Sequence, residues 1–185
     1  MTLPTFCGLG TGIYGAIVAD PPWSFKGYTT ETTPHRSADE PYNVLPLDDL
    51  LQLPVGALAA PDCVLFLWTI SSHMNQGFRL GEAWGFTYKA KAFEWFKTTK
   101  DGLATRMGMG FWTRQESETV LLFTRGSPKR KDKGVRSSIF APPREHSRKP
   151  DELYDRIERL VDGPYCELFA RRHRRGWDAW GDELL

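Results

Sequence analysis

The residues best suited to chemistry are Asp20, Pro21, Pro22 and Trp23, which directly follow a short apolar run at 16–19. A carboxylate and backbone carbonyls accept hydrogen bonds, and an indole ring offers a flat face for stacking. Prolines lack an N–H donor and fix φ near about −65°, so they end a strand and hold the cluster rigid. The set has acceptors and an aromatic surface but no nucleophile.

Such a cluster fits a planar ligand that carries an exocyclic amine, and adenine is a good match. The Asp20 carboxylate and a carbonyl would accept the two N–H bonds of the amine while Trp23 stacks on the ring, as in enzymes that read flipped bases. The alternative is an ordinary turn with Trp23 in the core, because Asp and Pro are common in turns. Trp23 and the apolar run before it favour the ligand site.

Composition limits the possible classes of protein. A chain of 185 residues with 41% hydrophobic content is long enough for one domain with a substantial core. Three cysteines without CxxC spacing and four scattered histidines favour a reducing compartment and argue against a metal site. No signal peptide pattern and no apolar run of membrane-spanning length occur. We expect a single domain over 1–185, located in the cytoplasm, that binds no metal.

The charge is distributed unevenly although the net charge is only +1. Residues 125–149 contain nine basic and two acidic side chains, whereas residues 31–62 contain one basic and six acidic side chains. A basic stretch of this kind is typical of proteins that bind a polyanion, and a solvated charged surface is the alternative. We assign contacts with nucleic-acid phosphates to Lys129, Arg130, Lys131, Lys133, Arg136 and Arg144.

Apolar patterns predict the secondary structure. Continuous apolar runs predict buried strands at 16–19, 64–68, 119–123 and 165–169, and loose alternation predicts a strand at 86–96. Helices are predicted at 46–53, 74–84 and 150–161, the last with acidic residues in its first turn. Long functional loops are predicted at 24–43 and 97–111. The alternation indicates an α/β fold with a mainly parallel sheet, in which ligands bind at the carboxyl ends of strands.

Several segments, taken in order, resemble the mRNA-adenosine-type N6-adenine methyltransferase family. They are Asp20-Pro21-Pro22-Trp23, Tyr42-Asn43, Leu65-Phe66-Leu67-Trp68, Trp84-Gly85-Phe86, the segment from Ser147 to Tyr154, the segment from Glu167 to Arg171, and Gly176-Trp177. The stretch from Glu167 to Arg174 lacks the dinucleotide motif GxGxxG, so the residues alone do not name a cofactor. The resemblance implies a Rossmann-like fold with helices on both sheet faces that uses S-adenosyl-L-methionine, with the catalytic motif first and the cofactor motif last.

The resemblance also assigns roles to residues. Asp20 and Pro21 would hold the N6 amino group, Pro22 would shape the turn, and Trp23 would stack on the target adenine. Lys149 would pair with the methionine carboxylate of the cofactor. The full set implied to bind the cofactor is Asp20, Lys149, Glu167, Leu168, Phe169, Arg171, His173, Asp182 and Glu183. Asp182 and Glu183 replace an amide pair of the family, and Arg174 replaces a smaller neutral residue.

The implied reaction is in-line transfer of a methyl group from the sulfonium to N6 of adenine. Compact bacterial and phage relatives look like DNA adenine methyltransferases, so we expect DNA as the substrate, in a bacterial or phage-infected cell. RNA methylation is one alternative, and an inactive nucleic-acid-binding partner subunit is another. Inactive paralogues typically lose the acid or the aromatic residue, and this chain keeps Asp20 and Trp23. For its assembly, the alternatives are a homodimer and a complex with a partner subunit.

Overall fold

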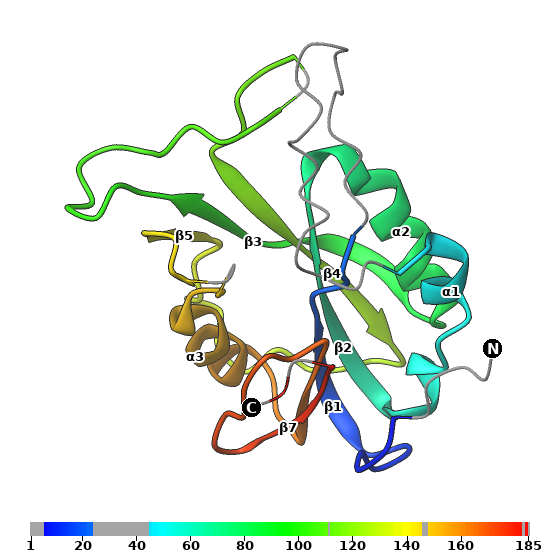
Figure 1. Cartoon of the computed structure of the whole chain (residues 1–185). Helices are drawn as coiled ribbons and strands as arrows, with labels where there is room; N and C mark the ends of the chain where they lie inside the picture. Colours follow the sequence, from blue (N-terminus) through cyan, green and yellow to red (C-terminus); the bar gives the residue numbers. More distant parts are fainter. Residues whose placement is uncertain (1–5, 24–44, 111, 146–147, 183, 185) are drawn as a thin grey trace.

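A single seven-stranded sheet with helices on both faces forms the centre of the computed structural model (Figure 1). The structure describes residues 6–23, 45–110, 112–145, 148–182 and 184, so the loop predicted at 24–43 lies outside the described residues. The strands are β1 (Tyr14–Ala19), β2 (Ala59–Thr69), β3 (Thr87–Lys97), β4 (Ser117–Arg125), β5 (Ser138–Ala141), β6 (Tyr165–Leu168) and β7 (Trp177–Trp180). The helices are α1 (Leu47–Leu51), α2 (Met74–Ala83) and α3 (Asp151–Leu160), with 3-10 turns at Val55–Ala57 and Ser71–His73.

The strand order is β5-β3-β4-β2-β1-β6-β7, and it confirms the predicted α/β, Rossmann-like class. Strand β1 pairs in parallel with β2 and β6, β7 pairs in parallel with β6, and β5 pairs in parallel with β3. Strand β4 lies between β2 and β3 and is antiparallel to both. Within the described sheet, β4 therefore runs against a common direction shared by the other strands.

Two separate apolar cores flank β1, which explains why its sequence is apolar at consecutive positions. Ile17 and Ala19 face the core covered by α1 and α2, whereas Ala16 and Val18 face the core covered by α3. All four side chains are fully buried. Burial of a Val or Ile side chain contributes about 1.5–3 kcal/mol, so both helical layers are held to the sheet mainly through such contacts.

The predicted helices and long strands occur within two residues of their expected bounds, except that β2 begins at Ala59, five residues before the predicted start at 64. Helix α2 ends before Gly85, whose φ of +86° is the left-handed conformation that glycine adopts most easily after a helix. Strands β5 and β7 were not predicted. Each has only four residues and only one buried side chain, so neither produces an apolar run that a sequence pattern can reveal.

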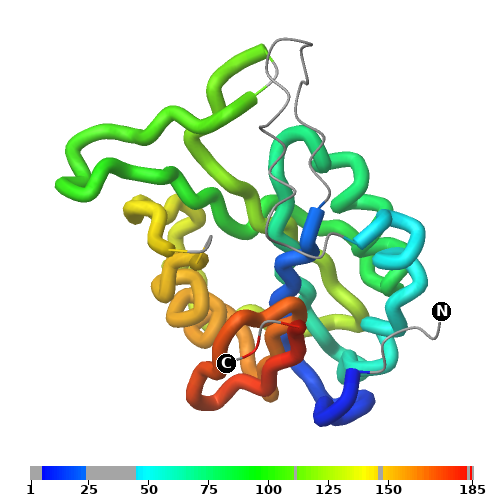
Figure 2. The backbone as a smooth tube through the Cα atoms, in the orientation of Figure 1, coloured from blue at the N-terminus to red at the C-terminus, as the bar shows by residue number. Residues whose placement is uncertain are grey.

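The common strand direction creates two distinct ends of the sheet. We call one end the carboxyl rim: it holds the residues after β1, β2 and β6, namely 20–23, 70–71 and 169–171, together with the start of β4 at 117–118. Strand β4 finishes at the opposite end, where the segment 126–137 begins. The long connection between β3 and β4 starts at the carboxyl rim and extends away from the sheet (Figure 2).

Candidate active site

The predicted Asp-Pro-Pro-Trp cluster lies at the carboxyl rim and is tied to both neighbouring strands. The Asp20 N–H donates to the Leu168 carbonyl at 3.4 Å, which extends the pairing of β1 with β6. The Trp23 N–H donates to the Pro21 carbonyl at 2.8 Å, and the Trp23 indole N–H donates to the Trp68 carbonyl at 3.2 Å. The cluster is therefore anchored on both sides, and the Pro21 carbonyl keeps one further lone pair for a ligand.

A buried lysine connects the cluster to a second carboxylate. Lys149 Nζ lies 3.1 Å from Asp20 Oδ2 and 3.0 Å from Glu118 Oε2, and the three side chains are only 11%, 22% and 15% exposed, respectively. Lys149 Nζ also lies 5.0 Å from the centre of the Trp68 ring, within range of a cation–π contact. The site thus contains an ordered array of alternating charges rather than an isolated carboxylate.

Electrostatic effects outweigh burial in this array. Burial alone would raise the pKa of Glu118, but the Lys149 and Lys97 ammonium groups hold that pKa at about 2. Burial alone would lower the pKa of Lys149, but Asp20 and Glu118 raise it above its usual range. Lys149 is therefore a permanent cation at neutral pH and Glu118 a permanent anion.

Glu118 and Lys97 are site residues that sequence reasoning missed. Lys97 ends β3 and forms an ion pair with Glu118, which is the second residue of β4. The one available signal was an acidic residue directly before the apolar run at 119–123. That run pairs with β3 and β2 only in the folded sheet. The sequence therefore did not show which basic side chains face Glu118.

Glu167 forms the second carboxylate group of the rim, on β6 beside Val18 of β1. Its Oε1 accepts a hydrogen bond of 2.7 Å from the Tyr154 hydroxyl, and the Arg174 guanidinium lies 4.3 Å from the centre of the Tyr154 ring. Burial raises the pKa of Glu167 to about 7, the Asp20 charge adds to this rise, and the Tyr154 hydrogen bond opposes it. Glu167 therefore changes its charge near neutral pH.

The residues after Glu167 turn sharply at the rim. Leu168 is fully buried, and Phe169 has φ of +63°, a left-handed conformation that is uncommon for a residue with a side chain. The Phe169 ring contacts Trp180 edge-on at 5.6 Å, and the Ala170 N–H donates to the Trp180 carbonyl at 2.9 Å. These contacts fix the loop after β6 against β7 and hold Phe169 in a strained backbone conformation of a kind that is concentrated at functional sites.

The other residues predicted to bind the cofactor are less buried where the structure describes them. Arg171 is partly buried, whereas His173 is exposed on the loop between β6 and β7, and Asp182 is exposed after β7. Glu183 lies outside the described residues. The structure thus brings Asp20, Lys149, Glu167 and Phe169 to one rim.

The six residues predicted to contact phosphates are divided between the two ends of the sheet. Arg144 lies at the carboxyl rim, where its guanidinium donates to Asp151 Oδ2 and to the Lys149 carbonyl, both at 2.8 Å. Lys131 instead pairs with Asp162 at 2.8 Å, beyond the far end of α3. Lys129, Arg130 and Lys133 are exposed on the same segment after β4. The structure therefore does not bring the 129–133 segment together with Asp20.

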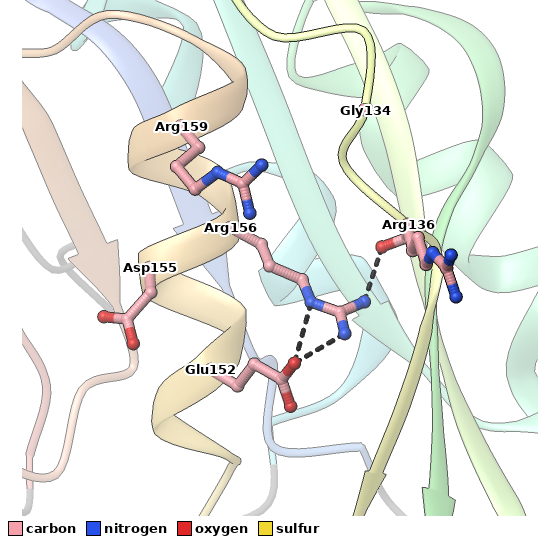
Figure 3. A pocket seen from close by; sticks show the side chains of 6 residues that line it. All are labelled: Gly134, Arg136, Glu152, Asp155, Arg156 and Arg159. Carbon is pink, nitrogen blue, oxygen red and sulfur yellow. Dashed lines mark hydrogen bonds and ion pairs between the residues drawn. The ribbon is translucent and has the colours of Figure 1, made fainter.

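Arg136 borders a cavity of about 270 Å³ beside α3, which Figure 3 shows with its lining side chains. Its lining residues are Gly134, Arg136, Glu152, Asp155, Arg156 and Arg159. Arg156 donates to Glu152 and to the Arg136 and Ser138 carbonyls. Its donors thus hold the segment before β5 against the helix, and this cavity lies apart from the Asp20 array.

The fold is that of a Rossmann-like α/β domain, with its Asp-Pro-Pro-Trp motif directly after the central strand β1. Residues 14–183 match the sequence model of the MT-A70 family. The chain therefore belongs to the MT-A70 family.

Individual relatives show the same relationship. The chain is 35% identical to Type II methyltransferase M.MunI from a Mycoplasma species, over 92% of this chain and 78% of that protein. It is 32% identical to an N(6)-adenosine-methyltransferase MT-A70-like protein of Arabidopsis thaliana and 30% identical to the human N(6)-adenosine-methyltransferase catalytic subunit METTL3, each over 94% of this chain. The chain spans only 24% and 28% of the lengths of these two proteins.

Membership of a methyltransferase family implies S-adenosylmethionine as the methyl donor, and the residues at the rim fit that cofactor chemically. The cofactor carries a carboxylate as well as cationic groups, and the rim offers both the Lys149 ammonium and the Glu167 carboxylate. The Trp68 indole N–H is buried and has no hydrogen-bond partner among the described residues, as expected for a donor kept for a ligand.

Among the described residues, no group of three or more His, Cys, Asp or Glu side chains is placed to hold a metal ion. The helices in this part of the chain are all too short or too polar to cross a membrane.

Proposed function

We propose that this protein transfers a methyl group from S-adenosylmethionine to N6 of adenine in DNA, acting in the cytoplasm as a single methyltransferase domain. The observation that carries the proposal is the Asp20-Pro21-Pro22-Trp23 cluster at the end of β1, anchored to β2 through the bond of 3.2 Å between the Trp23 indole and the Trp68 carbonyl. The activities for which the relatives are named, those of a Type II methyltransferase and two N(6)-adenosine-methyltransferases, support it.

In this proposal the cluster positions the amine of adenine. The Asp20 carboxylate and the free lone pair of the Pro21 carbonyl accept the two N6 protons, which concentrates electron density on the attacking nitrogen. Trp23 holds the base by stacking, and the bond from its indole N–H to β2 fixes the orientation of the ring. Because all three groups are held before the substrate binds, little conformational entropy is lost when the reacting atoms are aligned.

Lys149 and the rim of β6 would hold the cofactor, which supplies an electrophilic methyl group when bound. Two of the three N–H donors of Lys149 point to Asp20 and Glu118, so one remains for the methionine carboxylate. Glu167, Leu168, Phe169, Arg171, His173, Asp182 and Glu183 are the further residues we propose for cofactor contacts. Glu118 acts as a positioning residue, because its carboxylate holds the Lys149 ammonium beside Asp20.

The choice of DNA rests on the match with the Type II methyltransferase M.MunI from a Mycoplasma species, of which this chain covers 78%. RNA is the second candidate, supported by the similarity to proteins named as N(6)-adenosine-methyltransferases. An inactive partner subunit fits less well, because the array of Asp20, Lys149 and Glu118 is intact.

The test is methyl transfer from labelled S-adenosylmethionine to single-stranded DNA, duplex DNA and RNA of matched sequence, followed by nucleoside analysis. We expect N6-methyldeoxyadenosine from DNA and no product with Asp20→Ala. A product on RNA alone would replace the DNA assignment by the second candidate. Absence of transfer to any of the three, with cofactor binding intact, would refute the proposed function of the isolated chain.

A further inference from the structure

Four arginine side chains converge on one carboxylate at the carboxyl rim. Asp151, the first residue of α3, accepts bonds from Arg144 at 2.8 Å and from Arg148 and Arg174 at 3.2 Å, and Arg172 also pairs with it. Two of the arginines precede α3, and the other two lie on the loop after β6. We call these four arginines and Asp151 the Asp151 arginine cluster.

The cluster holds more donors than Asp151 can satisfy. Each guanidinium carries about five N–H donors, whereas one carboxylate offers about four acceptor positions. Glu145 and Asp155 add one ion pair each, at 3.2 Å and 3.6 Å, but these two acids are 65% and 69% exposed and therefore contribute weakly. Among the described residues, Arg148 Nε is also buried without a hydrogen-bond partner. The cluster thus keeps unused donors and an excess of positive charge.

A purely structural role does not explain this composition. One arginine suffices to pair with an exposed acid, and partly exposed ion pairs typically contribute only about 0–1 kcal/mol each. The four arginines face the carboxylates of Asp151, Glu145 and Asp155, which leaves the cluster with one positive charge in excess, and a single bound anion would compensate it. The planar guanidinium fork matches the oxygens of a phosphate, which makes arginine the preferred partner of that group.

The position of the cluster places such an anion close to the reacting centre. Asp151 lies two residues after Lys149, whose ammonium is 3.1 Å from Asp20, and Arg144 donates to the Lys149 carbonyl at 2.8 Å. Arg174 rests on the Tyr154 ring, which in turn binds Glu167. The amino end of α3, a helix of ten residues, adds its positive dipole at the same place. Figure 2 shows the loop after β6 beside this helix.

We propose that the Asp151 arginine cluster binds a backbone phosphate of the nucleic-acid substrate next to the target nucleotide, with Asp151 as the residue that positions the arginines. This inference rests on the proposed function, because it assumes a nucleic-acid substrate. The main phosphate contact then lies at the carboxyl rim and not on the exposed basic segment at 129–133, which is at the far end of the sheet. One bound phosphate accepts the donors that Asp151 leaves unused.

The test compares two charge-matched variants of the full chain. Arg148→Gln with Arg172→Gln removes two charges from the cluster, and Lys129→Gln with Lys133→Gln removes two from the far segment. Binding of a fluorescent DNA oligonucleotide is measured across a range of salt concentrations, without cofactor. We expect the cluster variant to bind about ten-fold more weakly at low salt, with the slope of log K against log salt reduced by about one, as for the loss of one phosphate contact, and the control to match the wild type.

Calorimetry of S-adenosylmethionine binding tests the alternative that the cluster binds the cofactor instead of a phosphate. We expect unchanged affinity for S-adenosylmethionine in the cluster variant. An unchanged oligonucleotide slope, an equal effect in the control variant, or a loss of cofactor affinity matching the loss of DNA affinity would each overturn the inference. If the double variant does not fold, Arg172→Gln alone makes the same comparison, since its side chain is 42% exposed.

Failure of this inference and failure of the proposed function are distinguishable. If the wild type and the cluster variant both methylate DNA equally well, the phosphate site is refuted and the proposed function stands. If the wild type methylates none of the substrates, but the cluster variant binds DNA more weakly and with a smaller salt dependence than the wild type, the phosphate site stands and the proposed function is refuted.

Discussion

Replacing Glu118 by glutamine tests whether the buried charge array stabilises the carboxyl rim. Glutamine keeps the size of the side chain but removes the charge that faces Lys149 and Lys97. The neighbouring cations lower the pKa of Glu118 from the ordinary 4.5 to about 2, which corresponds to about 3 kcal/mol of preference for the ionised form. Because this side chain is only 15% exposed, solvent screening is limited, and we expect Glu118→Gln to lower the unfolding free energy by about 3 kcal/mol at pH 7.

The pH dependence of this loss has a defined direction. The pKa of Glu118 is lower in the folded state than in the unfolded chain, so its contribution is complete above about pH 5 and declines as the pH falls toward 2. The difference in stability between wild type and Glu118→Gln should therefore be constant from pH 8 to about 5. Below pH 5 it should narrow, because the wild-type carboxylate becomes protonated in the unfolded chain.

Urea unfolding of both proteins at several pH values between 4 and 8 measures this difference. Glu82→Gln is the matched control, since Glu82 is exposed on α2 and its replacement should change stability by less than about 0.5 kcal/mol. Equal stability of the Glu118 and Glu82 variants at pH 7 would refute the reasoning. So would a difference that does not shrink below pH 5.

Three further perturbations test the rest of the site. Burial raises the pKa of Glu167 to about 7, so its contribution to the free energy of unfolding is complete below about pH 4.5 and is lost as the pH rises through 7. Urea unfolding between pH 5 and 8 should therefore show Glu167→Gln gaining stability relative to the wild type as the pH rises. Asp20→Ala should reduce methyl transfer by about 100-fold or more while circular dichroism shows an intact fold, and full activity would remove the basis of the proposal. Trp23→Phe keeps the stacking surface but loses the indole bond to the Trp68 carbonyl, so we expect kcat/KM for the oligonucleotide to fall by about ten-fold; an unchanged value would show that this bond does not position the base.

Predictions that rest on local pattern were confirmed where burial is extreme. The run at 16–19 is apolar at every position because β1 packs against helical layers on both sides, and α3 has an apolar stripe because it covers one face of the sheet. The short strands β5 and β7 were missed, since their pairing with longer strands, rather than their own side chains, makes them strands.

The family, the α/β class and the residue types of the Asp-Pro-Pro-Trp motif could be read from the sequence, because each rests on short segments of neighbouring residues. The contacts between charged side chains became visible in the folded chain alone. Glu118 contacts Lys149 because β4 runs antiparallel and starts at the carboxyl rim, and the same direction carries the segment at 129–133 to the opposite end. Arg148 and Arg172 meet at Asp151 only because the loop after β6 packs beside α3. Charges distant in sequence interact only across short distances in space, and the sheet sets those distances.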